Sequence, residues 1–241
     1  MDKRKLDISI ISDVHLGAYE WHAHELLKYL KSIQPGVLIL NGDFIDMFKL
    51  GKKQLPKEHI AVIREILDMA FKGVKVYYIT GNRDKVLKHF SEFSTNAIDI
   101  RDKLELQLKG NKYWVFHGGA FDNLFEVPSF MICVGSRVYG MLLRSNRMVN
   151  KWRVYFGKAR MCYAGRIKNK VKQSFKAIRD FEETAVQLAV QEGYDYVICG
   201  HIHQPVIKQV KKRQTSVVYM NPGDWVENLT ALEYDFEKWQ I

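Results

Sequence analysis

The stretch Ile8-Ser9-Ile10-Ile11-Ser12-Asp13-Val14-His15-Leu16-Gly17 decides the fold, because it has the pattern of a buried strand that ends in reactive groups. The β-branched run predicts the strand, and the Asp-x-His that follows predicts a loop at its carboxyl end. Open α/β sheets bind their ligands at that edge. An Asp and a His beside a turn are also found as a helix cap or a surface pair. The rest of the chain must therefore decide whether a metal binds here.

The remaining pattern alternates between helices and strands at first and then becomes mostly strands. Helical spacing of apolar residues predicts helices at Trp21 to Ile33, Lys57 to Phe71 and Asp180 to Gln191. Short apolar runs predict strands at Val37 to Asp43, Val74 to Ile79, Leu104 to Leu108, Lys112 to Phe116, Tyr194 to Cys199, Val206 to Val210, Ser216 to Met220 and Leu229 to Tyr234. The order at the start predicts parallel pairing, and the turn at Lys109-Gly110-Asn111 predicts a hairpin. In the second helix we expect one apolar side, formed by Ile60, Ile63, Ile66, Leu67 and Ala70.

Five of these strands end in turns that carry metal-competent side chains. They are Asp13 with His15, Asp43, Asn82, His117, and His201 with His203. Glycine stands next to most of them and lets the backbone turn sharply, so that the adjacent side chain faces inward. Imidazole, carboxylate and carboxamide groups without thiolates suit Mn²⁺, Fe²⁺ or Zn²⁺ better than Ca²⁺.

This ordered set resembles the motifs of the calcineurin-like metallophosphoesterase superfamily. Those motifs are Asp-x-His, Gly-Asp, Gly-Asn-His-Asp/Glu, a His followed by Gly, and Gly-His-x-His, and the matches run in that order from Asp13 to His203. The resemblance implies an α/β fold, a four-layer α/β/β/α sandwich whose two mixed sheets meet at a two-metal site. It also implies that Asp13, His15 and His203 hold one ion, that Asn82, His117 and His201 hold the other, and that Asp43 bridges them. We expect two divalent metal ions, Mn²⁺ with Fe²⁺ or Zn²⁺ as alternatives, that activate a water for attack on phosphorus.

One motif departs from the superfamily pattern, because Gly81-Asn82-Arg83-Asp84 replaces the usual Gly-Asn-His-Asp. That His is thought to protonate the leaving group, which an arginine cannot do, whereas an arginine can bind phosphate oxygens in a bidentate contact. A leaving group that is itself a phosphate monoester needs little protonation. Arginine in place of histidine at position 83 therefore favours a pyrophosphate substrate. Gly-Asn-Arg-Asp also resembles the UDP-2,3-diacylglucosamine diphosphatase group of the lipid A pathway, which releases UMP. We therefore expect Arg83, Asn82 and His117 to act in catalysis, with Asp84 orienting Arg83 or His117.

The net charge of +10 comes from one segment. Between Val127 and Arg179 there are thirteen Lys and Arg residues and no Asp or Glu, interleaved with apolar and aromatic residues. This pattern predicts a helical insert, or cap, at 125–178 within a single domain that spans 1–241. A solvated basic helical pair is the alternative. Because a diacylated substrate needs an apolar slot and a membrane dock, we expect the cap to hold acyl chains, Arg144 and Arg147 to meet phosphates or phospholipid, and Asp122 to contact a substrate hydroxyl.

Cysteine usage and hydropathy exclude several other classes. The three cysteines lie far apart without a C-x-x-C pair, which argues against a disulfide framework or a zinc knuckle and favours the cytosol. No uncharged run approaches the roughly 18 residues of a spanning helix, and the apolar run before Asp13 is too short for a signal peptide. We expect a cytoplasmic protein, peripheral on the inner face of the cytoplasmic membrane, that acts on a lipid-linked nucleotide.

Two other functions stay open as alternatives. One is a metal-dependent phosphodiesterase that acts on nucleic acid or on another lipid diphosphate, and the other is a scaffold that retains the fold without catalysis. The apolar content of the basic segment and Arg83 argue against a nucleic-acid partner. The presence of all seven candidate ligands argues against the scaffold.

Overall fold

The computed structural model describes residues 3–17, 22–46, 55–90, 94–95, 97–119, 150–156, 172–212 and 215–241, without the side chains of 172–177. The chain divides into two compact units, Met1–Gly119 with Thr184–Ile241, and Ala120–Glu183. The predicted insert at 125–178 falls within the second unit, and most of it lies outside the described residues. Its described parts are a short helix at 150–155 and the beginning of α6 (Lys172–Glu192).

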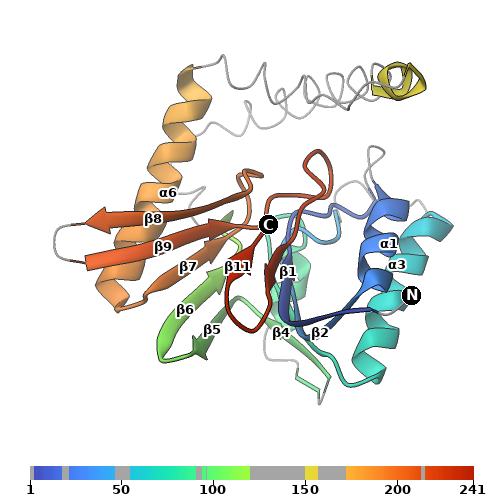
Figure 1. The fold of residues 1–241 in the computed structure, drawn as a ribbon, viewed down its shortest axis with the longest axis horizontal. Helices are drawn as coiled ribbons and strands as arrows, with labels where there is room; N and C mark the ends of the chain where they lie inside the picture. The colour runs from blue at the N-terminus through green and yellow to red at the C-terminus, as the bar shows by residue number, and fades with distance from the viewer. Residues whose placement is uncertain are drawn as a thin grey trace. The chain divides into compact units, whose positions relative to one another are not determined.

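The first of two mixed sheets begins with the predicted β-α-β-α-β pattern (Figure 1). Its strand order is β11-β10-β1-β2-β3-β4, in which β1 to β4 pair in parallel and β10 and β11 are antiparallel. The strands are β1 (Arg4–Ile11), β2 (Ile33–Asn41), β3 (Lys75–Ile79), β4 (Ile98–Arg101), β10 (Leu232–Tyr234) and β11 (Trp239–Gln240). The parallel pairing of β1, β2 and β3 confirms the prediction.

The second sheet combines two hairpins with a central parallel pair. Its order is β5-β6-β7-β9-β8, with β5-β6 and β8-β9 antiparallel and with β7 parallel to both β6 and β9. The strands are β5 (Lys103–Leu108), β6 (Asn111–Phe116), β7 (Tyr196–Cys199), β8 (Val206–Lys212) and β9 (Thr215–Asn221). The predicted hairpin of β5 and β6 is confirmed, and the fold is α/β with two mixed sheets.

A hydrophobic core joins the inner faces of the two sheets, and helices cover the outer face of the first. The inner core contains Ile10, Ile39 and Ile79 from the first sheet and Val115, Ile198 and Met220 from the second. Helices α1 (Ala23–Ser32) and α3 (Lys57–Phe71) pack on the outer face of the first sheet through a second cluster that includes Leu26, Leu30, Val62, Leu38 and Leu40. The core therefore leaves the ends of the strands available for function.

Several predicted boundaries differ from the structure. Strand β2 begins at Ile33 and contains Pro35, which is tolerated because β3 pairs with β2 only from Val37 onward, so this part of β2 is an edge. Helix α6 extends back to Lys172 because no Gly or Pro interrupts it. Strand β10 is shorter than predicted, and β4 and β11 were too short for their patterns to predict.

Helix α3 has the predicted bounds but not the predicted apolar side. Ile66 and Ala70 are buried as expected, together with Val62 and Met69. Ile60 and Leu67 are exposed instead. Because Val62 and Met69 take the core positions, the buried face lies about a fifth of a turn away from the predicted one.

No helix in the described part of the chain combines the length and the apolar content needed to cross a membrane.

Candidate metal centre

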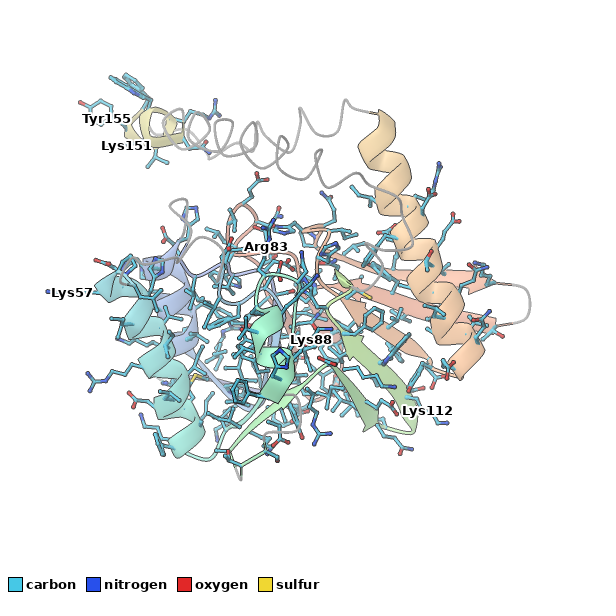
Figure 2. The ribbon with its side chains drawn as sticks, turned by 180° about the vertical axis from the view of Figure 1, so that it is seen from behind. Lys57, Arg83, Lys88, Lys112, Lys151 and Tyr155 are labelled. Atoms are coloured by element: carbon cyan, nitrogen blue, oxygen red, sulfur yellow. The ribbon has the colours of Figure 1, made fainter. Side chains whose placement is uncertain are left out.

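The five predicted strand-end turns converge at one edge of the first unit. Asp13 follows β1, Asp43 follows β2, Asn82 follows β3, His117 follows β6, and His201 and His203 follow β7. The strands within each sheet that carry these turns are parallel, so their carboxyl ends meet. Figure 2 shows Arg83 among the loops at this edge, beyond the 3-10 helix η1 (Lys85–Phe90).

Asp13, His15 and His203 form one cluster of ligand atoms. One potential ligand atom from each lies within 4.8 Å of the other two. His203 Nε2 is 3.2 Å from Asp13 Oδ1, and His15 Nε2 is 4.0 Å from the same oxygen. The two imidazole rings are stacked with centroids 5.5 Å apart. Both rings thus present Nε2 to one carboxylate oxygen.

Asp13, Asp43 and His117 form a second cluster with the same 4.8 Å limit. Asp43 presents a different oxygen to each of two histidines, with Oδ1 at 3.5 Å from His117 Nε2 and Oδ2 at 3.9 Å from His15 Nε2. Asn82 Oδ1 lies 3.2 Å from His117 Nε2. The His201 ring lies edge-on to that of His117, with centroids 5.3 Å apart. Asp43 is therefore placed between the two groups of ligands.

The backbone at this edge is strained. Positive φ angles occur at Asp13 (53°), His15 (53°), Asp43 (49°), His201 (67°) and His203 (55°). The left-handed conformation costs a non-glycine residue roughly 1–2 kcal/mol. Strain of this kind gathers at functional sites and persists only where the surroundings enforce it. Here the turns hold one another, because Asp13 N donates to Gly42 O and His15 N donates to Asp43 O.

Two glycines allow the close approach of these turns. A Cβ on Gly42, which has a φ of 76°, would strike the ring of His117. A Cβ on Gly200 would overlap Ser12 Oγ and lie 2.7 Å from Asp13 Oδ2. Glycine is required at both positions because two candidate ligands occupy the space of a side chain.

Sequence reasoning missed the groups that orient the histidines. Asp46 Oδ2 lies 3.8 Å from His15 Nδ1, and Asp224 Oδ2 lies 3.5 Å from His203 Nδ1. His117 Nδ1 lies 2.9 Å from the Asn41 carbonyl oxygen, an acceptor that fixes the proton on Nδ1 and leaves Nε2 for the site. Such partners orient metal-binding histidines. For Asp46, the sequence did offer a signal, because this carboxylate stands only three residues after the candidate ligand Asp43.

Asp84 anchors two of the turns. Its Oδ1 accepts a hydrogen bond from Gly81 N at 2.6 Å, and its Oδ2 accepts from Phe44 N at 3.1 Å and from Tyr78 Oη at 2.5 Å. Burial is the main cause that raises the pKa of Asp84. These bonds tie the turn after β2 to the turn after β3, a role that differs from the predicted orientation of Arg83 or His117.

The buried carboxylates create a demand for positive charge. Burial opposes the charge of Asp43, but the imidazoles of His117 and His15 lower its pKa to about 2. Burial likewise lowers the pKa of His117 and His203, but the Asp43 and Asp13 carboxylates outweigh it and raise the two values to about 9 and about 10. Burial and the charge of His203 lower the pKa of His15 to about 4. Protons on two histidines thus supply the cationic charge when no metal is bound.

Divalent cations fit this donor set. Asp13 Oδ1 is buried and accepts no hydrogen bond from the described residues, although it faces His15 and His203. The Asn82 amide oxygen faces other acceptors, and only a rotated amide would donate to Asp43 Oδ1 at 3.0 Å and Oδ2 at 2.9 Å. A cation would satisfy the oxygens of Asn82 and Asp43, which face one another as acceptors. Imidazole and carboxylate donors suit Mn²⁺, Fe²⁺ and Zn²⁺.

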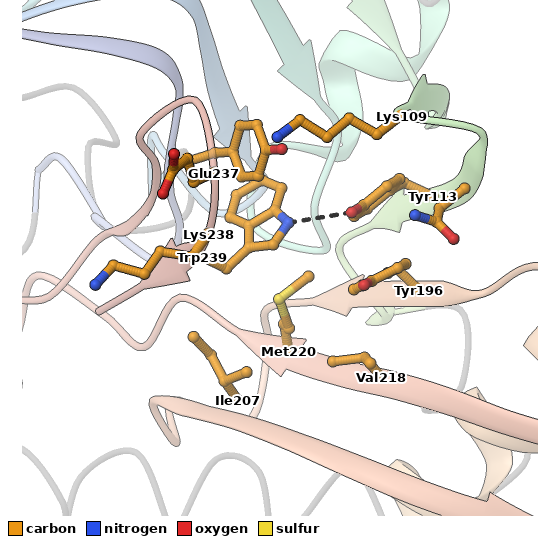
Figure 3. A pocket seen from close by; sticks show the side chains of 11 residues that line it. Lys109, Tyr113, Tyr196, Ile207, Val218, Met220, Glu237, Lys238 and Trp239 are labelled. Carbon is orange, nitrogen blue, oxygen red and sulfur yellow. Dashed lines mark hydrogen bonds between the residues drawn. The ribbon is translucent and has the colours of Figure 1, made fainter.

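A separate concavity lies away from this edge (Figure 3). It has a volume of about 330 Å³ and is lined by aromatic side chains that include Tyr113, Tyr196 and Trp239. Trp239 Nε1 donates to Tyr113 Oη at 3.4 Å, as the dashed line shows. Tyr113 and Tyr196 lie near the beginnings of β6 and β7, whose opposite ends carry the candidate ligands, so the concavity is not part of the metal centre.

The other predicted site residues are accounted for as follows. Asp122, Arg144 and Arg147 lie outside the described residues. Arg83 N donates to Asp43 Oδ1 at 2.7 Å, which places Arg83 beside the second cluster.

One comparison with known proteins identifies a family. Residues 6–205 match the family described as calcineurin-like phosphoesterase. The chain is 25% identical over 249 residues to a UDP-2,3-diacylglucosamine hydrolase of Histophilus somni, covering 96% of this chain and 97% of that one. It is 26% identical over 239 residues to the protein of the same name from Haemophilus influenzae, covering 92% of each. A solved structure described as a novel archaeal phosphodiesterase matches with a TM-score of 0.47 and 17% identity, over 97% of this chain and 96% of that one.

Proposed function

Since the chain belongs to the calcineurin-like phosphoesterase family, a family of metal-dependent phosphoesterases, we propose that it hydrolyses the pyrophosphate of a nucleotide-linked glycolipid. The substrate proposed is UDP-2,3-diacylglucosamine, and the products are UMP and 2,3-diacylglucosamine 1-phosphate. Two relatives named for the hydrolysis of that compound match almost the whole chain, at 25% and 26% identity. The observation that carries the proposal is Arg83 beside Asp43, where the superfamily motif has histidine.

The proposed metal ligands are the seven residues that the strand-end turns provide. Asp13, His15 and His203 would hold one ion, Asn82, His117 and His201 the other, and Asp43 would bridge them. When bound, such ions supply positive charge to phosphate oxygens and lower the pKa of water toward neutrality. Mn²⁺ is the proposed ion. Asp43 turns Oδ1 toward His117 and Oδ2 toward His15, which supports its bridging role.

The protein's own groups would orient the substrate and hold protons in place. The Arg83 guanidinium would bind phosphate oxygens, because the bond from its backbone N–H to Asp43 fixes its Cα beside the ligands. His117 keeps its proton on Nδ1, which donates to the Asn41 carbonyl, so that Nε2 faces the site. Arginine cannot donate a proton at neutral pH, so the leaving UMP phosphate must depart as a stable anion. A pyrophosphate meets that condition, whereas an alkyl phosphate ester does not.

We further propose the four-layer α/β/β/α sandwich with a helical cap at 125–178 that contacts acyl chains and the membrane surface. The short helix at 150–155 and its neighbour Phe156 support this proposal. Trp152, Tyr155 and Phe156 are exposed, and the cations Lys151 and Arg153 alternate with them in the sequence. Figure 2 shows Lys151 and Tyr155 on this short helix. Exposed aromatic and basic side chains together are typical of a helix that lies in a membrane interface. The protein would then act as a peripheral enzyme on the cytoplasmic face of the membrane.

The test of this function measures UMP release from UDP-2,3-diacylglucosamine with and without Mn²⁺. We expect metal-dependent UMP release by the wild type and none by Asp43→Ala, which loses the bridging carboxylate. Arg83→Ala should lower kcat/KM by roughly tenfold or more while the metal content stays unchanged, because Arg83 is not a ligand. Arg83→Lys serves as the control that keeps the charge but loses the bidentate geometry.

Failure of this test would redirect the assignment in a defined way. No UMP release by a metal-loaded protein that hydrolyses a chromogenic phosphodiester would contradict the substrate while keeping the family chemistry. The search would then turn to other lipid diphosphates and to nucleic acid.

A further inference from the structure

Tyr78 is a buried residue of β3 that is not itself a candidate metal ligand. Its ring packs edge-on against Phe44, with centroids 6.0 Å apart, in the cluster between the first sheet and its helices. Its hydroxyl lies 2.5 Å from Oδ2 of Asp84, which is fully buried. Burial and the charge of Asp84 raise the pKa of Tyr78, so the phenol keeps its proton and is the donor. Hydrogen bonds of this length to a carboxylate are among the stronger ones in proteins.

The Asp84 carboxylate holds the backbone of two turns that carry proposed ligands. Its Oδ2 also accepts a hydrogen bond from Phe44 N at 3.1 Å, in the turn after β2, and its Oδ1 accepts one from Gly81 N at 2.6 Å, in the turn after β3. Phe44 directly follows Asp43, and Gly81 directly precedes Asn82. Each oxygen of Asp84 therefore fixes the backbone beside one proposed ligand.

The same two turns are packed tightly against each other at the bridging carboxylate. Arg83 N donates to Asp43 Oδ1 at 2.7 Å. A Cβ on Gly81 would overlap Asp43 N and Oδ1, so no free space separates the turns there. Packing of this density transmits small displacements instead of absorbing them. A reoriented Asp84 carboxylate would therefore move Gly81 relative to Asp43 and change where the Asp43 oxygens stand.

We propose that Tyr78 is a positioning residue for the bridging carboxylate and acts through Asp84. The Tyr78 hydroxyl fixes the orientation of the Asp84 carboxylate, and that carboxylate sets the spacing of the two turns. The spacing determines how well Asp43 can divide its oxygens between two ions. Because Asp43 is the proposed ligand that both ions share, a shift in its place weakens the binding of the pair. The inference rests on the metal centre of the proposed function, but it does not depend on the substrate.

The test is calorimetric titration of the metal-free protein with Mn²⁺, for the wild type and for Tyr78→Phe. This substitution keeps the ring against Phe44 and removes only the hydroxyl. We expect Mn²⁺ affinity to fall by roughly 10–100-fold, as it does when other groups that orient metal ligands are lost. Tyr77→Phe is the matched control, because Tyr77 stands next to Tyr78 in β3 but packs on the opposite face of the sheet, against the inner core. Its Mn²⁺ affinity should equal that of the wild type.

A double-mutant cycle separates positioning from a loss of stability. Asparagine at position 84 cannot accept hydrogen bonds at both ends of its side chain, so Asp84→Asn should weaken Mn²⁺ binding at least as much as Tyr78→Phe. If Tyr78 acts through Asp84, adding Tyr78→Phe to Asp84→Asn should change Mn²⁺ affinity by less than about twofold. The Tm of each metal-free variant is measured alongside, because a purely structural role of Tyr78 would lower the Tm and leave the Mn²⁺ affinity of the folded protein unchanged. If Asp84→Asn does not fold, the comparison of Tyr78→Phe with Tyr77→Phe decides alone.

The possible failures point to different claims. Unchanged Mn²⁺ affinity in Tyr78→Phe, with two ions bound by the wild type, would overturn this inference and leave the proposed function standing. An equal loss of affinity in Tyr77→Phe would overturn it too, since the effect would then come from the sheet as a whole. A full effect of Tyr78→Phe in the Asp84→Asn background would contradict the route through Asp84. A wild type that binds fewer than two ions would overturn the proposed ligand set and this inference with it.

Discussion

Replacement of Gly200 by alanine should disturb the metal centre through the space that a single methyl group occupies. The φ of Gly200 lies outside the left-handed region, so its backbone can accept an L side chain. The new Cβ would overlap Ser12 Oγ, approach Asp13 Oδ2 to 2.7 Å and approach His117 Nδ1 to 3.1 Å. Ser12 Oγ donates to Asp13 Oδ2 at 2.6 Å, so the methyl group displaces both this bond and the carboxylate. The effect therefore reaches two proposed ligands directly.

The expected magnitude follows from this overlap. Overpacking of a tightly packed site typically costs about 1–3 kcal/mol of unfolding free energy. For a chain of this size, each kcal/mol corresponds to a fall in Tm of roughly 2–4 °C. A change in the support of a metal ligand lowers metal affinity by roughly 10–100-fold. We expect both effects in Gly200→Ala.

Calorimetric titration with Mn²⁺ and thermal unfolding of the metal-free protein would measure these two effects. Gly193→Ala is the matched control, because Gly193 has a φ of 75° but no atom within 4 Å of a built Cβ. It should lose roughly 1–2 kcal/mol through backbone strain and keep its metal affinity. Unchanged Mn²⁺ affinity in Gly200→Ala, at a stability loss equal to that of the control, would refute the placement of Asp13 and His117 at the metals.

Three further predictions follow from contacts at and beyond the site. Asp224→Asn removes the carboxylate that lies 3.5 Å from His203 Nδ1. It should weaken Mn²⁺ binding by roughly 10–100-fold in calorimetric titration. Unchanged Mn²⁺ affinity would show that Asp224 does not support a metal ligand. Glu233→Gln should cost roughly 1–2 kcal/mol at neutral pH in urea unfolding, because Arg4 donates two hydrogen bonds of 2.8 Å to Glu233 and Tyr29 donates one of 2.9 Å. Burial opposes the charge of Glu233, but these bonds lower its pKa below the usual value. The stabilisation is therefore present above the unfolded pKa of about 4.3 and is lost as the pH falls through the folded pKa. A difference in unfolding free energy between Glu233→Gln and the wild type that does not shrink in acid would contradict this. Mn²⁺ at about 100 times its Kd should stabilise the wild type by about 2.7 kcal/mol per site, and a chelator should reverse the shift in Tm.

Local pattern was sufficient to predict the part of the site that lies next to each strand. A β-branched run followed by a turn places Asp13, Asp43 and His117 at the carboxyl ends of their strands, and the topology then brings them to one edge. The supporting groups could not be predicted in this way. Asp224 reaches His203 only because the turn after β9 folds back onto the turn after β7, and no short-range pattern encodes that contact.

The exposed side of α3 shows a second limit of sequence pattern. Ile60 and Leu67 share helical spacing with buried residues, so periodicity assigns them to the core. The structure instead fills the core with Val62 and Met69, which lie on a neighbouring arc of the same helix. When a helix has apolar residues over more than half of its circumference, spacing alone cannot choose the buried side.

The central claim is that this strand edge binds two divalent ions that support phosphate hydrolysis. The most direct measurement is native mass spectrometry with Mn²⁺, run in parallel with hydrolysis of a chromogenic phosphodiester by the wild type and by Asp43→Ala. We predict two ions per wild-type chain, and activity that a chelator removes and that Asp43→Ala lacks. Turnover that survives complete metal removal, or wild-type turnover by Asp43→Ala, would contradict the account.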